Sequence, residues 1–117
     1  MNKERTFERD LLLPALQALA ESERADIGLS TKELAQTLRR KIVPTAKDME
    51  KLPSRNDDRL SQVIRNLISH RTLERKGLAI YHKDLISGVG YYRLTELGKG
   101  TLLANYVDQK LPTNLSQ

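Results

Sequence analysis

The sequence predicts a mainly α-helical fold with one small β-hairpin, which is an α+β fold class. Apolar residues recur at every third or fourth position through most of the chain, the spacing of amphipathic helices. Between about residues 78 and 94 this spacing gives way to two short runs of Ile, Tyr and Val bracketed by glycines, as in a hairpin. The 117 residues suffice for one domain with a modest core. We expect that domain to span residues 1–111 and residues 112–117 to form a flexible C-terminal tail.

Four elements are predicted before residue 57. They are a helix over about residues 7–21, a short strand at residues 27–29, a helix over about residues 31–41 and a short helix over about residues 45–51. Pro14 is compatible with the first helix if the regular part starts near it, because proline is tolerated in the first turn. Ser30 and Glu33 have the spacing of a capping box, which predicts the start of the second long helix.

The strongest helical pattern lies near residues 57–72. Its apolar residues fall at positions i, i+3, i+4, i+7 and i+8 and are Leu60, Val63, Ile64, Leu67 and Ile68. Asn56 or Asp57 can cap the start of this helix. Leu73 extends its apolar face, and Gly77 stands where a left-handed helix stop is expected.

A hairpin and a last helix follow. The hairpin is expected to have a loop of about six residues, with Ile80 and Tyr91 closing the core. Thr95 then caps the last helix, which Pro112 ends. The apolar side of this helix is expected to comprise Leu97, Leu102, Leu103, Tyr106 and Val107. A helix, a turn and a second helix that leads directly into a two-stranded hairpin form the winged variant of the helix-turn-helix, so we predict a winged helix-turn-helix.

The positive charge is concentrated in one block of the chain. Residues 1–50 carry nine basic and nine acidic side chains, and residues 94–117 carry two of each. Residues 51–93 carry nine basic and four acidic side chains, which accounts for the whole net charge of +5. Such a cluster is a plausible footprint for a nucleic-acid backbone. The alternative is a slightly basic surface with no ligand.

The pattern also predicts which residues contact DNA. With the apolar stripe of the helix near residues 57–72 turned inward, its opposite face carries polar side chains that can bond base edges in the major groove. The predicted base contacts are Arg59, Gln62, Arg65, Asn66 and Ser69. The predicted contacts to the DNA backbone, mostly in the hairpin, are Arg55, His82, Lys83 and Arg93. The alternatives are an ordinary hydrated helix face and a hairpin that only closes the core. For Arg39, Arg40 and Lys41 we expect a favourable interaction with the dipole of their own helix.

The stretch from Leu11 to Leu103 resembles the winged-helix domain at the N-terminus of Mrr-type restriction proteins. The matching pieces are LLLPALQALAES, STKELAQTL, the LPS of residues 52–54, RLSQVIRNLISHRTLERKGL and GVGYYRLTELGKG. The resemblance implies DNA binding by the third main helix and the wing. Members of that family often have an aromatic residue in this helix, where the present chain has Asn66, Leu67 or nearby aliphatic residues.

The sequence predicts a DNA-binding protein that is not an enzyme. The larger restriction proteins carry a nuclease domain after this module, and we expect none here, because the sequence ends at Gln117. The E-x-K spacing of Glu74 and Lys76 and the similar spacing of Asp48 and Lys51 are expected to be surface charge. With no cysteine and two histidines, we expect neither a metal site nor a cofactor.

The expected partners are double-stranded DNA and a second copy of the chain. No apolar stretch is long enough for a membrane span, so we predict a cytoplasmic protein. The first and last helices each have an apolar face, part of which can pair two copies of the chain, so we predict a homodimer. Its predicted role is the regulation of transcription. The alternative function is a protein interaction module that uses the wing tip and the C-terminal helix. Leu85 and Ile86, two apolar residues in the hairpin loop, motivate that alternative.

Overall fold

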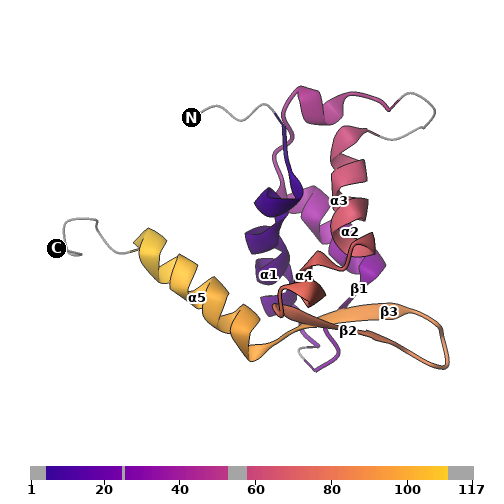
Figure 1. Ribbon diagram of the computed structural model, residues 1–117, viewed down its shortest axis with the longest axis vertical. Coiled ribbons are helices and arrows are strands. Elements are labelled where there is room, and N and C mark those ends of the chain that lie inside the picture. Colours follow the sequence, from indigo (N-terminus) through magenta and orange to yellow (C-terminus); the bar gives the residue numbers. More distant parts are fainter. Residues whose placement is uncertain (1–4, 25, 53–57, 111–117) are drawn as a thin grey trace.

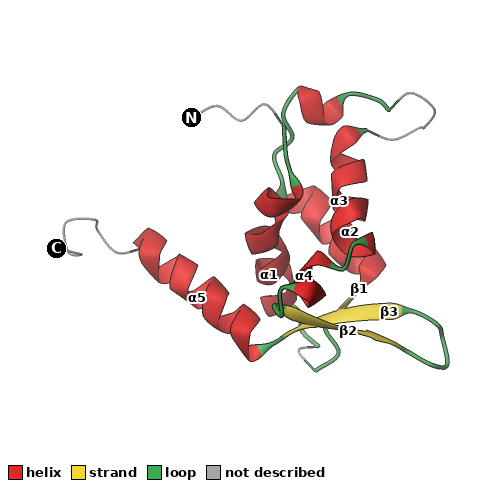
Figure 2. Cartoon of the chain, viewed as in Figure 1, coloured by secondary structure: helices red, strands yellow, loops and turns green. Residues whose placement is uncertain are grey.

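The computed structural model describes residues 5–24, 26–52 and 58–110. The elements in chain order are η1 (Glu8–Leu11), α1 (Leu12–Ala20), β1 (Leu29–Ser30), α2 (Thr31–Lys41), η2 (Lys47–Met49), α3 (Arg59–Ser69), α4 (Thr72–Arg75), β2 (Ala79–Lys83), β3 (Gly90–Leu94) and α5 (Glu96–Lys110). The fold is mainly helical with a small antiparallel sheet, which confirms the predicted α+β class (Figure 2). The predicted tail, residues 112–117, lies outside the described residues.

The helices α1, α2 and α3 pack together, and the sheet lies at one end of this group (Figure 1). The core between them consists mainly of leucine side chains, and Tyr92 reaches it from the sheet. The three strands are ordered β1-β3-β2, so β3 is central. Helix, strand, helix, helix and hairpin thus follow one another in a winged-helix-like layout.

Two predicted helices in the first half of the chain have different forms. The first starts as the 3-10 turn η1 and becomes α-helical at Leu12, which places Pro14 in the first turn of α1 as predicted. The expected helix at residues 45–51 is only the single 3-10 turn η2. The expected strand at residues 27–29 is two residues long and begins at Leu29.

The bounds predicted for the helix near residues 57–72 are wrong. Helix α3 starts at Arg59 behind an N-cap by Asp58, and the proposed caps Asn56 and Asp57 lie outside the described residues. The chain then turns at Arg71, which has a left-handed backbone with φ 53°, before the short α4 begins. The apolar spacing could not reveal this break, because buried leucines continue across it, Leu67 before Arg71 and Leu73 after it.

The predicted hairpin is present, with six residues between β2 and β3, but its inward face is the opposite of the one expected. Ala79 and Tyr92 are buried, whereas Ile80 is exposed and Tyr91 is half-buried. Side chains alternate along a strand, so a shift by one residue exchanges the two faces. The Tyr92 hydroxyl donates to the carbonyl of Ile68 in α3 (3.3 Å), which joins the sheet to the helices.

Helix α5 leaves the sheet and projects from the domain on the side opposite the hairpin loop (Figure 1). Its first half rests on α1 and β3. Leu102 is half-buried there, whereas Leu97 and Leu103 are exposed. The side chains of residues 106–110 are outside the described set.

Candidate nucleic-acid interface

The outward side of α3 forms a polar ridge. We use this name for Gln62, Arg65, Asn66 and Ser69, which lie opposite the buried Leu60, Val63, Ile64 and Leu67. Arg65 and Ser69 are exposed, and Gln62 and Asn66 are half-buried. The ridge is therefore the surface that the apolar stripe predicted.

The side chains of the ridge are linked to one another. The Arg65 guanidinium donates to Oε1 of Gln62 (2.9 Å), and Nε2 of Gln62 donates to Oδ1 of Asn66 (2.8 Å). Arginine, glutamine and asparagine can each make two hydrogen bonds to a base edge. The hydrogen bonds hold these three side chains next to one another. The side chains therefore lose less conformational entropy when they bind a ligand.

Arg59, the fifth predicted base contact, is placed differently. It begins α3, where its guanidinium forms an ion pair with Glu50 (3.3 Å) from the preceding loop. Its Nε atom is buried and has no hydrogen-bond partner. The loop before α3 folds back on the helix and so places an acidic side chain, Glu50, beside its first turn.

A partly buried ion pair joins α3 to α2. The Arg39 guanidinium in α2 donates to both carboxylate oxygens of Asp58 (2.8 and 2.6 Å) and to Oγ of Ser61 (3.1 Å). Asp58 also accepts the amide of Ser61 and so caps α3. These bonds from Arg39 and Ser61 lower the pKa of Asp58 well below its usual range. The expectation that Arg39 interacts mainly with its own helix dipole is therefore wrong.

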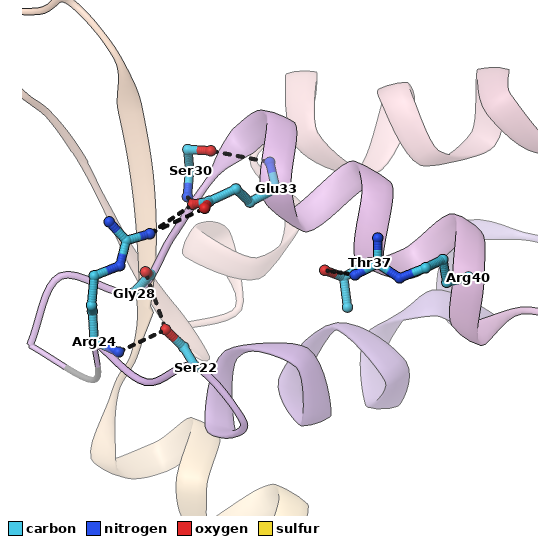
Figure 3. Close-up of polar contacts among 7 residues, drawn as sticks. All are labelled: Ser22, Arg24, Gly28, Ser30, Glu33, Thr37 and Arg40. Carbon is cyan, nitrogen blue, oxygen red and sulfur yellow. Dashed lines mark hydrogen bonds and ion pairs between the residues drawn. The ribbon is translucent and has the colours of Figure 1, made fainter.

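A shallow groove of about 630 Å³ runs between α2 and α3 beside the ridge. We call it the α2–α3 groove. Its lining residues are Ala35, Gln36, Arg39, Arg40, Ser61, Ile64 and Arg65. Three of them are arginines and none is acidic. Arg39 is compensated by Asp58, whereas Arg40 is exposed and, within the described parts of the chain, bonds only the neutral hydroxyl of Thr37 (3.3 Å; Figure 3).

The start of α2 is fixed by a capping box and an ion pair. Ser30 and Glu33 form the predicted capping box, with the Glu33 amide donating to the Ser30 hydroxyl (3.0 Å) and the Ser30 amide to Glu33 (2.9 Å). Arg24 adds an ion pair to Glu33 (3.0 Å), as Figure 3 shows. The bond from the Ser30 amide is the main reason that the pKa of Glu33 is lowered.

The hairpin, which we call the wing, has a well-ordered loop. The Asp84 carboxylate accepts both the amide (3.1 Å) and the hydroxyl (2.7 Å) of Ser87, which lowers the pKa of Asp84. The Gly88 amide donates to the Asp84 carbonyl (2.8 Å). This loop holds Leu85 and Ile86 outward, each 97% exposed.

The predicted backbone contacts do not form one cluster. Strand pairing places His82 and Arg93 on one face of the wing and Lys83 on the other. His82 stacks on Tyr91 with ring centroids 5.6 Å apart and is half-buried, whereas Lys83 is exposed. Arg55 lies outside the described residues.

Sequence reasoning missed Arg40 and Gln36 as members of the candidate site. Both are exposed on α2 beside the ridge. The available signal was the run of three basic residues at the end of α2, which has an equally good local explanation. No group of three or more acidic or histidine side chains that could hold a metal ion occurs in the described parts of the chain. Nor does any helix there have both the length and the apolarity to cross a membrane.

Comparison of the chain with protein-family models, with curated proteins and with solved structures found no match. The resemblance to the Mrr-type domain therefore stays a prediction. The function must be inferred from the geometry of the ridge, the grooves and the wing.

Proposed function

We propose that the protein binds double-stranded DNA, with the ridge of α3 in the major groove and the wing against the backbone. The observation that carries this proposal is the arginine-lined α2–α3 groove directly beside a ridge of base-reading side chains. A major groove is about 12 Å wide and admits one helix. Phosphates border it, and they would lie against the flank of α3, where Arg40 is exposed.

The division of labour within the site follows from the side chains. Gln62, Arg65 and Asn66 would read base edges, and Ser69 would contribute one further hydrogen bond. Arg40 in α2 and Lys83 in the wing would contact phosphates, which supply affinity but no sequence preference. Asp58 would not oppose them, because Arg39 neutralises it.

We further propose that the protein acts as a homodimeric transcription regulator rather than as an enzyme. The projecting α5, with Leu97 and Leu103 exposed, supports self-association through this helix. Dimers of helix-turn-helix proteins place their recognition helices about 34 Å apart, one turn of DNA.

Titration of a labelled random duplex of about 30 base pairs at several salt concentrations tests the proposal. Affinity should fall steeply with salt, because each neutralised phosphate releases counterions. Selection from a random library should then yield a preferred sequence. Absence of binding at low salt would refute the DNA function.

Docking on another protein through the wing tip and α5 is a second candidate function. It is supported by Leu85 and Ile86, which are almost fully exposed on an ordered loop. In that case, the wild-type protein would show no salt-dependent retention on DNA. Binding of the protein partner would instead be lost when Leu85 and Ile86 are both replaced by Ser.

A further inference from the structure

The segment before α1 holds an aromatic ring between two arginines. The guanidinium carbon of Arg5 lies 4.7 Å from the centre of the Phe7 ring, and that of Arg9 lies 4.8 Å from it. Phe7 is 39% exposed, and Arg9 is exposed. Stacking on a ring fixes the plane and position of a guanidinium while leaving its hydrogen-bond donors for other acceptors.

The segment is anchored from within. Thr6, between the two stacked residues Arg5 and Phe7, is fully buried. Its amide and its hydroxyl donate to the two carboxylate oxygens of Asp48 (2.6 and 2.7 Å), which also accepts the amide of Thr45 (3.0 Å). Burial would raise the pKa of Asp48, but these hydrogen bonds outweigh it and lower the pKa. The arginines therefore sit on a fixed piece of backbone.

The charges of Arg5 and Arg9 are not neutralised within the described residues. Neither has an ion-pair partner there, and Nε of Arg5 is buried without a hydrogen-bond partner. The two described acids of this segment have other partners: Glu8 bonds His70 (3.1 Å) and Thr72 (2.8 Å), and Asp10 accepts the amide of Phe7 (2.8 Å).

These arginines lie along the other side of α3. Together with Phe7 and Glu8 they line a depression of about 310 Å³ that also includes Val63 and Asn66 of α3. Asn66 is linked through Gln62 to Arg65, which lines the α2–α3 groove. The ridge therefore has a basic surface on each side: Arg40 on one, and the Arg5–Phe7–Arg9 stack on the other.

We propose that the Arg5–Phe7–Arg9 stack binds the phosphodiester backbone of DNA on the strand opposite to the one that Arg40 contacts. This inference rests on the proposed function, because it assumes that the ridge enters a major groove. The two phosphate strands that border such a groove would then each meet arginines of the protein. Phe7 positions the guanidinium groups, and Arg5 and Arg9 donate to phosphate oxygens.

The test compares salt dependence in matched variants on the same random duplex. Each phosphate contact contributes about 0.9 to the slope of log affinity against log salt. The double variant Arg5→Ala, Arg9→Ala should therefore lower the slope by about 1.8, and Arg9→Ala alone by about 0.9. The control Lys99→Ala also removes one positive charge, from α5 where Lys99 pairs with Glu96, and should leave the slope unchanged.

A second double variant, Arg5→Gln with Arg9→Gln, keeps long side chains over Phe7 and should show the same loss of slope. If circular dichroism shows that the alanine variant is unfolded, the glutamine variant is used to measure the change in slope. An unchanged slope in a folded double variant, with normal salt-dependent binding by the wild type, would overturn the inference and leave the proposed function intact. Failure of the wild type itself to bind would overturn both.

Discussion

Replacement of Asp58 tests how α2 and α3 are held together. Asp58 is 8% exposed and has two roles: it caps α3 by accepting the Ser61 amide, and it forms a bidentate ion pair with Arg39. Asp58→Asn preserves the shape and the capping ability, since asparagine caps helices as well as aspartate does. It removes the charge and replaces one of the two oxygens that accept from Arg39 by an amide NH2 group. Asp58→Ala removes both functions.

The expected losses follow from these contacts. Hydrogen bonds to charged groups contribute about 1.5–3 kcal/mol each. The Arg39 side chain is 37% exposed, so water screens the pair, and we expect Asp58→Asn to lower the free energy of unfolding by about 2 kcal/mol in total. Loss of the cap adds about 1 kcal/mol, which gives about 3 kcal/mol for Asp58→Ala. Arg39→Ala should cost about 2 kcal/mol, and both changes together about 3 kcal/mol rather than the sum.

The effect should depend on pH in a defined direction. The pKa of Asp58 is lowered in the folded protein, chiefly by the hydrogen bonds from Arg39. Its contribution to stability is therefore complete above the pKa of an unfolded aspartate, about 3.9, and is lost as the pH falls toward the folded pKa. The difference between wild type and Asp58→Asn should be largest above about pH 5 and narrow below about pH 4. The contribution of Asp48 to stability is also lost in acid, because its pKa is lowered too, but this loss is the same in both proteins.

Urea denaturation of the wild type and these four variants, followed by circular dichroism at several pH values, measures these quantities. Arg24→Ala serves as a control, because the ion pair of Arg24 with Glu33 is exposed on both sides and should contribute little. Equal stability of wild type and Asp58→Asn at pH 7 would refute the reasoning. So would additive losses in the Arg39 and Asp58 double variant.

Three further predictions concern binding and the wing. Arg65→Ala should weaken binding to a selected sequence by about 1–3 kcal/mol, measured by titration, and unchanged affinity would remove Arg65 from the base contacts. Lys83→Ala should weaken binding to all duplexes alike and lower the slope of log affinity against log salt by about 1, whereas a loss of affinity confined to one sequence would contradict a phosphate contact. Gly90→Ala should destabilise the fold by about 1–3 kcal/mol in thermal melting, because the added methyl group would collide with the Tyr81 ring; a stability equal to wild type would show that this ring moves aside.

Features that depend on residues close together in the chain were determined by the sequence itself, among them the start of α2 and the outward face of α3. The Ser30–Glu33 capping box lies within one helical turn, so its pattern specifies the start of α2 directly. The apolar stripe of α3 determines its inward face, and the same periodicity identifies Gln62, Arg65, Asn66 and Ser69 as outward. The length of the wing loop followed from the glycines around it.

Tertiary contacts decided the rest, because they join residues that no local pattern connects. Strand register depends on which face meets the helices, and here Tyr92 rather than Tyr91 is buried. The run of basic residues at the end of α2 gave no sign that Arg39 would meet Asp58, 19 positions away.

The N-terminal arginines show the same limit most clearly. They lie outside the basic block that the charge distribution identified. Contacts such as those of Thr6 with Asp48, 42 positions away, and of Glu8 with His70, 62 positions away, bring them to the side of α3. Periodicity and local charge specify the faces of each helix, but the surface that the helices share depends on contacts between distant parts of the chain.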